Sequence, residues 1–380
     1  MILRIFFAIV VAAVAFGLRW RAIEGLPTDY DETPYLTAAQ KLADVLRSGD
    51  LAELTATSTQ PEHPQLMQLL FAAAILPAPD SEPSPERPNV GGGMSRLPEA
   101  QLLAARTAAG ALGALEVLLV ACLSPLAGLF LAIHTFTIKY TSLVMLEALP
   151  AFTSLATVMS YQRFQRTQRR GWWIASGVLL GLSAAGKYMY AVVGVAILID
   201  WWLALRTTPT GSFSKLRPTL GPWAQLRPLV SWGLLSLATF FAANPYLWPD
   251  PLWRLENSLF YHAEYSSAPN LGGFPPWQPF VWLATSLPQA TARAAPSLFL
   301  LRLDPWISLL ALLGLDRLWR KQRVYVLWLA VGLLFLLIWN TKWPHYILIL
   351  TAPLCLAAAE GAQRLFVGPL RALLARRFGS

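Results

Sequence analysis

The sequence predicts an all-α protein that crosses a membrane about ten times. Of its 380 residues, 55% are hydrophobic and only 13% are charged, and its mean hydropathy is +0.46. Soluble domains carry about twice that share of charged residues. Apolar runs of about 20 residues, the length a helix needs to cross a membrane, recur along the chain and are separated by basic or irregular segments. These observations favour one helical bundle embedded in a membrane.

The basic residues indicate which ends of the spans face the cytoplasm. They account for a net charge of +9, but they gather between apolar runs rather than along one polar surface. Loops rich in lysine and arginine stay on the cytoplasmic side. The distribution therefore predicts membrane orientation, with both termini inside, and argues against nucleic acid as a partner. The clusters are Arg163–Arg170, Arg206–Arg227, Arg317–Arg323 and Arg371–Arg377.

Orientation and length together predict two helical hairpins. The apolar run Trp172–Leu205 has 34 residues, roughly 50 Å as a helix, and basic residues flank both of its ends. It must therefore cross the membrane twice, with Gly186-Lys187-Tyr188 at its outer turn. The run Leu102–Ile138 is also too long for one crossing, and Ser124-Pro125 offers an inner turn.

The remaining apolar runs predict single crossings. With the two hairpins they bring the total to about ten, and Phe280–Leu301 fits no crossing and is predicted to lie along the outer interface. The predicted single spans are Ile2 to about Leu18, Ser142–Tyr161, Leu229–Ala243, Trp306–Leu318, Val324–Trp339 and Tyr346–Leu365.

This topology predicts one transmembrane domain over residues 1–380, with two large outer loops at 19–100 and 244–302. The stretch Ala78–Pro98 is rich in proline and glycine, which predicts a flexible outer loop. The inner connection is placed at Thr207–Pro228, and Asn244–Pro279 is expected to pack over a site, with a lid as one interpretation. A cleaved signal peptide ending at Ala13-Val14-Ala15 is a less favoured alternative, because a single basic residue precedes the first apolar run.

An acidic pair, Asp31-Glu32, opens the first outer loop in the sequence Thr-Asp-Tyr-Asp-Glu-Thr-Pro-Tyr. One interpretation is structural, since Asp31 can cap the following amphipathic helix and acidic groups in a first turn favour the helix dipole. The other is chemical: two carboxylates beside lipid but within reach of water suit general-base catalysis. The two roles are compatible, so both stay open.

Several other ionisable side chains are predicted on the same face. Glu147 is placed about one turn inside its span, where a carboxylate facing lipid costs roughly 2.5 kcal/mol or more, so it should face the bundle interior. Lys187, Lys342 and Arg106 add cations, and Tyr346 adds a hydroxyl. Alone, each lysine is explained as an interfacial anchor. Together with the carboxylates, they have the composition of a site where a base acts beside a bound anion.

Seven short motifs follow one another along nearly the whole chain. They are Tyr-Asp-Glu at 30–32, Glu-His-Pro at 62–64, Ala-Arg at 105–106, Met-Leu-Glu at 145–147, Gly-Leu-Ser-Ala-Ala-Gly-Lys-Tyr at 181–188, Asn-Pro-Tyr-Leu-Trp at 244–248 and Thr-Lys-Trp-Pro-His-Tyr at 341–346. In their order and predicted side of the membrane, these motifs resemble the GT-C glycosyltransferases, and within them most closely the protein O-mannosyltransferase and lipid A aminoarabinose transferase group.

The resemblance implies inverting transfer of a sugar from a polyprenyl-phosphate donor to a protein, lipid or glycan acceptor at the extracytoplasmic face of the plasma (inner) membrane. Asp31 would then be the base, with Glu32 or Glu147 positioning the acceptor or the sugar. The expected donor-phosphate ligands are Lys187, Lys342, Tyr346, Arg106 and Tyr35.

The resemblance leaves the cofactor open. An acidic residue and a histidine hold a metal in the aminoarabinose transferases, and they match Glu62 and His262. Two ligands do not make a metal site, so a divalent metal is one alternative and no cofactor is the other. Gln65 and Gln68 depart from the His-Pro-Pro-Leu-Gly-Lys pattern of the group, which removes one phosphate cation and puts the acceptor class in doubt.

Two other functions compete with the transferase. A carrier or flippase for a lipid-linked sugar would place ionisable groups near the membrane midplane, whereas here they are predicted to gather at one face. A purely structural membrane protein would leave Glu147 unexplained. The enzyme is therefore the preferred hypothesis.

Overall fold

The computed structural model describes residues 2–56, 58–78, 87–88, 94–95, 97–207, 222–267, 273–287, 298–299 and 301–367. Nearly all of these form helices, and one short antiparallel ladder pairs Arg87–Pro88 (β1) with Met94–Ser95 (β2). The α-helices are α1 (Ile2–Gly25), α2 (Glu32–Ser48), α3 (Leu51–Ala56), α4 (Leu66–Ile75), α5 (Glu99–Leu123), α6 (Pro125–Ile133), α7 (Thr135–Tyr140), α8 (Ala148–Thr167), α9 (Arg170–Gly186), α10 (Val192–Thr207), α11 (Pro222–Ala242), α12 (Pro251–Ser267), α13 (Gln278–Ala284), α15 (Asp304–Ile338) and α16 (Leu348–Ala362). The short 3-10 and π turns are η1 (Tyr188–Ala191), η3 (Pro245–Leu247), η4 (Pro344–Ile347) and η5 (Gln363–Val367).

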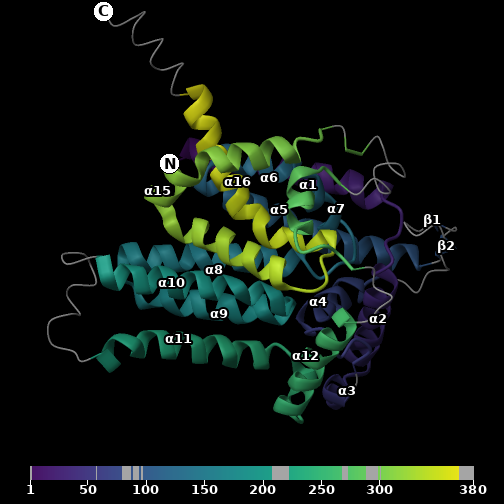
Figure 1. The fold of residues 1–380 in the computed structure, drawn as a ribbon. Helices are drawn as coiled ribbons and strands as arrows, with labels where there is room; N and C mark the ends of the chain where they lie inside the picture. The colour runs from purple at the N-terminus through teal and green to yellow at the C-terminus, as the bar shows by residue number, and fades with distance from the viewer. Residues whose placement is uncertain are drawn as a thin grey trace, which may run out of the picture.

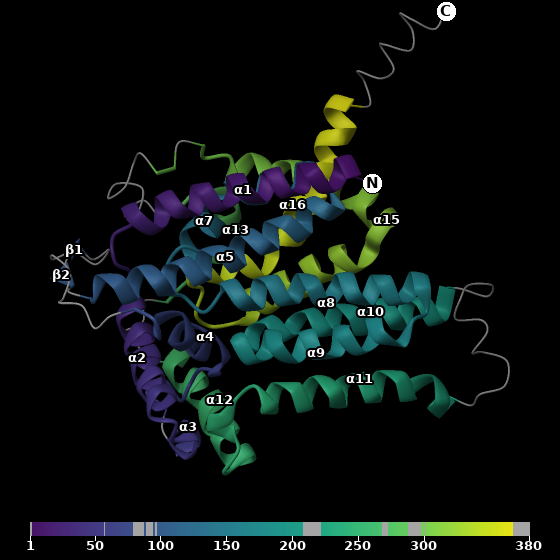
Figure 2. The same cartoon turned by 180° about the vertical axis from the view of Figure 1, so that it is seen from behind.

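The long helices lie side by side as a bundle, and the short helices α2, α3, α4 and α12 gather at one end of it (Figures 1 and 2). The N-terminus, the α8–α9 turn, the facing ends of α10 and α11 and the bend of α15 lie at the opposite end. Three of the predicted basic clusters flank these connections. The bundle therefore separates a basic end from the end that carries the predicted site.

The chain reverses at both predicted hairpin turns, while the membrane crossings of their arms stay predictions. Ser124 adopts an extended conformation between α5 and α6, and its hydroxyl accepts a bond from the amide of Ala127, so a capped turn reverses the chain there. Lys187 is likewise extended between α9 and η1. In α15, Gln322 leaves the helical region at φ −154°, ψ 65°, which divides the element into two arms. These arms match the predicted spans before and after the third basic cluster.

The polytopic all-α membrane architecture is confirmed, while the count of ten crossings stays a prediction. Five helical stretches within the described residues are long and apolar enough to cross a membrane. They are Leu3–Gly25, Glu99–Leu123, Tyr188–Arg206, Asp304–Ile338 and Pro344–Phe366.

Some element boundaries differ from those expected. The first helix continues to Gly25 instead of ending near Leu18, because Arg19, which the sequence places at a membrane boundary, is buried between helices. Helix α11 begins at Pro222, inside the predicted inner loop. Helix α8 begins only at Ala148, so Glu147 stands at its amino-terminal boundary and not one turn inside it. Most of the predicted flexible loop Ala78–Pro98 lies outside the described residues.

The tightest helix contact joins α15 and α16. A Cβ atom on Gly314 would collide with the carbonyl oxygen of Ala357, and one on Gly361 would collide with that of Leu310. The two backbones can approach this closely only because neither residue has a side chain. Small residues serve the same purpose at helix contacts within membranes generally.

We expect Gly314→Ala to destabilise the protein, because the added methyl group must push α15 away from α16. Overpacking of this kind typically costs about 1–3 kcal/mol. Thermal unfolding of the purified protein in detergent should therefore occur at a lower temperature than in the wild type. Gly233→Ala in α11 is the matched control, since a Cβ there meets nothing within 4 Å. Equal stability of the two variants would contradict the close contact.

Candidate active site

The candidate site lies where the chain passes from α1 to α2. The segment that follows α7 and the turns η1 and η4 border it. Asp31 stands at the start of α2, yet its side chain makes no capping hydrogen bond, which contradicts the helix-cap interpretation. The carboxylate is half-buried, so its polar atoms are held away from bulk water without the backbone donors that a cap supplies. An acidic side chain in this situation is available for chemistry.

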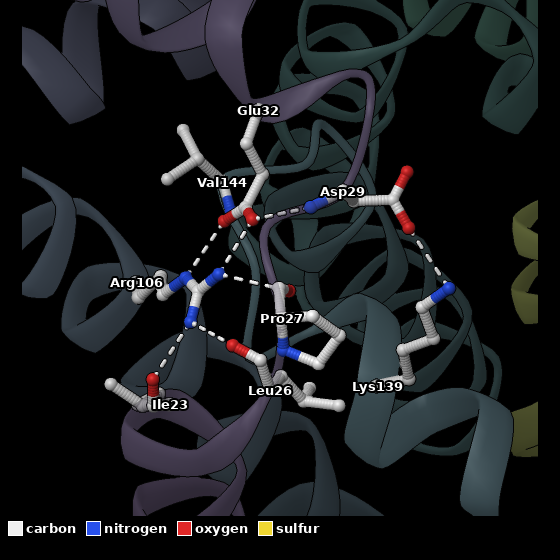
Figure 3. Close-up of polar contacts among 8 residues, drawn as sticks. All are labelled: Ile23, Leu26, Pro27, Asp29, Glu32, Arg106, Lys139 and Val144. Carbon is white, nitrogen blue, oxygen red and sulfur yellow. Dashed lines mark hydrogen bonds and ion pairs between the residues drawn. The ribbon is translucent and has the colours of Figure 1, made fainter. Parts of the chain in front are cut away.

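Glu32 and Arg106 form a buried ion pair instead of two separate site groups (Figure 3). Both side chains are fully buried; the Arg106 Nε lies 2.8 Å from Glu32 Oε1 and its Nη2 lies 2.6 Å from Oε2. The carboxylate also accepts the amides of Asp29 and Val144. The remaining Arg106 donors reach the carbonyls of residues at the end of α1, namely Ile23, Leu26 and Pro27.

These contacts use all five N–H donors of Arg106. In this arrangement Arg106 has no donor left for a phosphate, and Glu32 has both oxygens occupied. The pair ties α5 to the end of α1, the start of α2 and the segment before α8. Its evident role is to fix the backbone from which Asp31 projects.

A second pair, Asp29–Lys139, lies close by and was not predicted from the sequence. Lys139 Nζ is 2.9 Å from Asp29 Oδ2 (Figure 3). It also lies 4.6 Å from the centre of the Tyr140 ring. The sequence feature that could have pointed to this pair is the lysine directly after the long apolar run ending at Ile138. Because that run was assigned wholly to a hairpin, the lysine that ends it was overlooked.

Glu147 and Lys187, both predicted site residues, form a third pair. Lys187 donates from Nζ to Glu147 Oε1, and His345 Nε2 lies 3.7 Å from the same oxygen. Glu147 Oε2 is buried and has no hydrogen-bond partner among the described residues. Tyr346 completes the group, since Lys187 Nζ lies 5.1 Å from the centre of its ring. The helix ends that meet here are those of α8, α9 and α16.

Tyr35 and helix α12 enclose the group from two sides. Tyr35 is buried and its hydroxyl lies 3.2 Å from His63 Nε2, which links α2 to the segment before α4. On the other side, the Tyr188 hydroxyl lies 2.9 Å from Ser258 Oγ on α12. Helix α12, in the second predicted outer loop, therefore contacts the turn that follows Lys187, while its packing over the site stays a prediction.

Lys342, another predicted phosphate ligand, does not join the Glu147–Lys187 pair. It is buried, and its ammonium donates to the carbonyl oxygen of Trp339. Its own carbonyl accepts a 2.9 Å bond from the indole of Trp282 on α13. Burial lowers the pKa of Lys342, and no carboxylate of the site offsets this effect. Lys342 therefore belongs to the edge of the site rather than to the Glu147–Lys187 group.

The proposed metal pair remains a prediction from resemblance. Glu62 is half-buried beside Tyr35, and burial raises its pKa. The backbone of His262 lies in α12, but its side chain falls outside the described residues. The part of the chain that the structure describes contains no group of three or more histidine, cysteine, aspartate or glutamate side chains arranged to hold a metal.

The electrostatic environment of Asp31 suits a base. Burial, reinforced by the negative charges of Asp29 and Glu147, raises its pKa from 3.8 to about 6, and the nearby Lys187 and Lys139 only partly offset this. A base works best when its pKa lies near the working pH, because it is then both deprotonated and reasonably basic. Asp31 meets that condition.

An apolar groove opens near the site between α13, the two arms of α15 and α16. Its volume is about 620 Å³ and all but one of its lining residues are apolar or alanine, the exception being Ser308. Helix α13, which lines this groove, also holds Trp282 against Lys342. Helix α13 therefore contacts both the groove and the segment that carries Lys342.

A further buried pair lies within the spans and was missed by the sequence analysis. Arg19 on α1 donates a 2.8 Å bond to Thr141 Oγ1 and packs near Glu116 on α5, and all three residues are buried. Neither oxygen of Glu116 has a hydrogen-bond partner within the described residues. The sequence does show Arg19 and Glu116 each as a single charged residue inside a long apolar run, which is the feature that could have predicted a buried pair.

Comparison with solved structures finds the same fold in membrane glycosyltransferases, at sequence identities that show likeness of fold alone. No family model and no curated protein matches the sequence. The fold thus confirms the resemblance that the motifs predicted. A likeness at such low sequence identity shows the fold and not the activity.

The similar structures include ArnT from Cupriavidus metallidurans in two states. The apo form matches with a TM-score of 0.61 at 15% identity, covering 96% of this chain and 61% of that one. The form bound to undecaprenyl phosphate matches with a TM-score of 0.57 at 16% identity, covering 94% and 60%. The present chain thus spans about three fifths of the length of ArnT.

Proposed function

We propose that this protein is an integral membrane glycosyltransferase that moves a sugar from a polyprenyl-phosphate donor to an acceptor hydroxyl. The observation that supports it best is the half-buried Asp31 carboxylate, which lacks a capping bond and lies beside the Glu147–Lys187 pair. One solved structure with this fold is described as bound to undecaprenyl phosphate. The proposed reaction face is the extracytoplasmic one, opposite the basic turns.

The proposed chemistry is a single displacement. The acceptor oxygen attacks the anomeric carbon from the side opposite the phosphate, and a new carbon–oxygen bond forms with inversion. The bond between the anomeric carbon and the phosphate oxygen breaks, and polyprenyl phosphate leaves with the electron pair. Asp31 takes the proton of the attacking hydroxyl, which makes the oxygen a better nucleophile.

The leaving phosphate needs positive charge and donors. Lys187 supplies an ammonium that Glu147 holds in place, and Tyr346 lies beside it. Fixed charges of this kind stabilise a developing anion without reorganisation during the reaction. The apolar groove beside α13 suits the prenyl chain, because its lining is almost free of polar atoms. Helix α13, which lines that groove, also contacts the backbone of Lys342, so we propose that Lys342 meets the donor as it enters.

The decisive experiment supplies purified protein in liposomes with synthetic undecaprenyl-phosphate sugars and a panel of protein, lipid and glycan acceptors. We expect release of undecaprenyl phosphate that depends on the acceptor, with the sugar attached to the acceptor in inverted configuration. A carrier would instead move a fluorescent lipid-linked sugar between leaflets without releasing the phosphate. That outcome would replace the transferase by a flippase.

The pH dependence of transfer should report on Asp31. Because its pKa is raised to about 6, the carboxylate is charged and able to accept a proton above pH 6 and is protonated below it. The rate should therefore fall about tenfold for each pH unit below 6 and level off above. An unperturbed aspartate would keep full activity down to about pH 4. A rate that is constant from pH 7 to 4.5 would contradict the assignment of Asp31 as the base.

A further inference from the structure

A second, polar cavity lies on the site end of the bundle, along the face of α2 that points toward α3 and α4. Its volume is about 440 Å³, which falls in the range of small-molecule sites, roughly 300–1,000 Å³. It shares no lining residue with the candidate active site. The lining residues are Ala38, Lys41, Leu42, Asp44, Val45, Ser48, Glu53, Ser58, Thr59, Gln65 and Gln68.

Two buried side-chain NH₂ groups in this lining lack a hydrogen-bond partner among the described residues. Gln65 and Gln68 are each 1% exposed, and the Nε2 atom of each has no hydrogen-bond partner among the described residues. The orientation of Gln65 is well determined, since its Oε1 accepts the amide of Tyr246 at 2.8 Å. Its NH₂ group therefore cannot exchange places with the oxygen. Leaving a buried donor unsatisfied costs free energy, which a bound ligand would recover.

The other lining groups indicate an uncharged ligand. Three hydroxyls, from Ser48, Ser58 and Thr59, can donate or accept hydrogen bonds. Lys41 is the single cation in the lining, Glu53 is acidic, and the Asp44 carboxylate is paired with Arg47 at 2.8 Å, so the lining has no excess of positive charge that would favour a phosphate or another anion. A molecule that accepts from amides and donates to carboxylates fits best. Neutral carbohydrate has this combination on every sugar unit.

The position of the cavity relative to Asp31 suits the distant part of an acceptor. Ala38, the nearest lining residue on α2, is seven residues from Asp31, about 10 Å along the helix. Tyr35, which lies between these two positions along α2, is bonded to His63. The cavity is therefore too far from the base to hold the reacting hydroxyl. Binding a remote part of a substrate can still orient its reacting end.

We propose that this cavity binds a neutral glycan, as the non-reacting portion of the acceptor. The inference rests on the proposed transferase function and names the acceptor class: a hydroxyl-rich oligosaccharide that extends from Asp31 along α2 to Gln65 and Gln68. The amides of Gln65 and Gln68 donate to sugar oxygens, and the carboxylates of Asp44 and Glu53 accept from sugar hydroxyls.

The test measures binding directly and needs no donor. Purified full-length protein in nanodiscs is titrated with a panel of neutral tetrasaccharides in gluco, manno, galacto and rhamno configurations, with a serine- and threonine-containing hexapeptide, and with inorganic phosphate. We expect at least one tetrasaccharide to bind, and Gln68→Leu to weaken it at least tenfold. Lys41→Met is the second variant, because Lys41 is exposed and its loss leaves the fold intact.

Gln40→Leu is the matched control. Gln40 also lies on α2, but its amide donates to Gln101 Oε1 at 2.6 Å and it does not line the cavity, so saccharide binding should not change. Absence of binding by every tetrasaccharide, or binding that neither Gln68→Leu nor Lys41→Met weakens, overturns the proposal. So does binding of the hexapeptide alone, which would assign the cavity to a peptide.

The outcomes also separate this proposal from the proposed function. Saccharide binding that depends on Gln68, without any sugar transfer from a polyprenyl donor, would support the glycan-binding cavity and reject the transferase function. Sugar transfer to a lipid or peptide acceptor without saccharide binding would support the transferase function and reject the glycan-binding cavity.

Discussion

Asp31→Asn is expected to abolish sugar transfer while the protein stays folded. Asparagine keeps the size and polarity of the side chain but cannot take up the proton of the attacking hydroxyl. General-base catalysis contributes about 10²–10⁴-fold to a rate, so turnover should fall by about that factor. The measurement is acceptor-dependent release of undecaprenyl phosphate under saturating donor, compared with the wild type.

The same variant should be at least as stable as the wild type. A raised pKa means that burial disfavours the charged carboxylate in the folded state, so at neutral pH the ionised group destabilises the fold. A shift from 3.8 to about 6 corresponds to at most about 3 kcal/mol, which a neutral amide avoids. The side chain also makes no capping bond that the substitution would remove.

Thermal unfolding of Asp31→Asn distinguishes a catalytic from a structural role. Loss of transfer with an unchanged or higher unfolding temperature supports the base, whereas loss of both transfer and stability would indicate that Asp31 holds the structure. Thr33→Ala, at an exposed position in the first turn of the same helix, is the control and should alter neither. Full transfer by Asp31→Asn would reject the assignment.

Arg106→Met should have the second large effect, and on stability rather than on chemistry. The substitution leaves the Glu32 carboxylate buried without its cation. It also removes the hydrogen-bond donors of three carbonyl groups at the end of α1. Breaking a buried ion pair in this way costs about 3–5 kcal/mol. We expect low yield of folded protein and a much lower unfolding temperature in detergent.

Glu32→Gln tests the same arrangement more gently. A glutamine still fills the space and accepts the amide of Val144 with its oxygen, but it loses the charge that faces Arg106. We expect reduced stability with donor affinity unchanged in the protein that folds. A weaker donor affinity in folded Glu32→Gln, measured by competition with undecaprenyl phosphate, would instead indicate that the Glu32–Arg106 pair belongs to the donor site. Lys41→Met serves as a charge-removing control at an exposed position.

The fold was largely predictable because it follows from features that can be read along the sequence without knowledge of tertiary contacts. Apolar length marks a span, and the side of the basic clusters marks orientation, so the hairpins at Ser124 and Lys187 could be placed without knowledge of any contact. Helix boundaries were less predictable. The length of α1 depends on the burial of Arg19 against Thr141, a residue 122 positions away.

The candidate site was predictable in composition but not in pairing. Glu147 and Lys187 were both expected at the site, and their ion pair joins segments 40 residues apart. The sequence offered no means of deciding that Glu32 would face Arg106, that Lys139 would face Asp29, or that Lys342 would turn toward Trp339. Carboxylates next to each other in the chain project to different neighbours, so adjacency of Asp31 and Glu32 says nothing about a shared role.

The sequence by itself determined that this is a helical membrane protein with its basic turns on one side and a group of carboxylates and lysines on the other. It did so because transfer of side chains into lipid depends on local composition. Only the tertiary structure decided which charges neutralise one another: Arg106 uses all its donors on Glu32 and on carbonyls, whereas Asp31 keeps a carboxylate without a capping bond. A charge inside a protein takes its chemical properties from neighbours that distant parts of the chain supply.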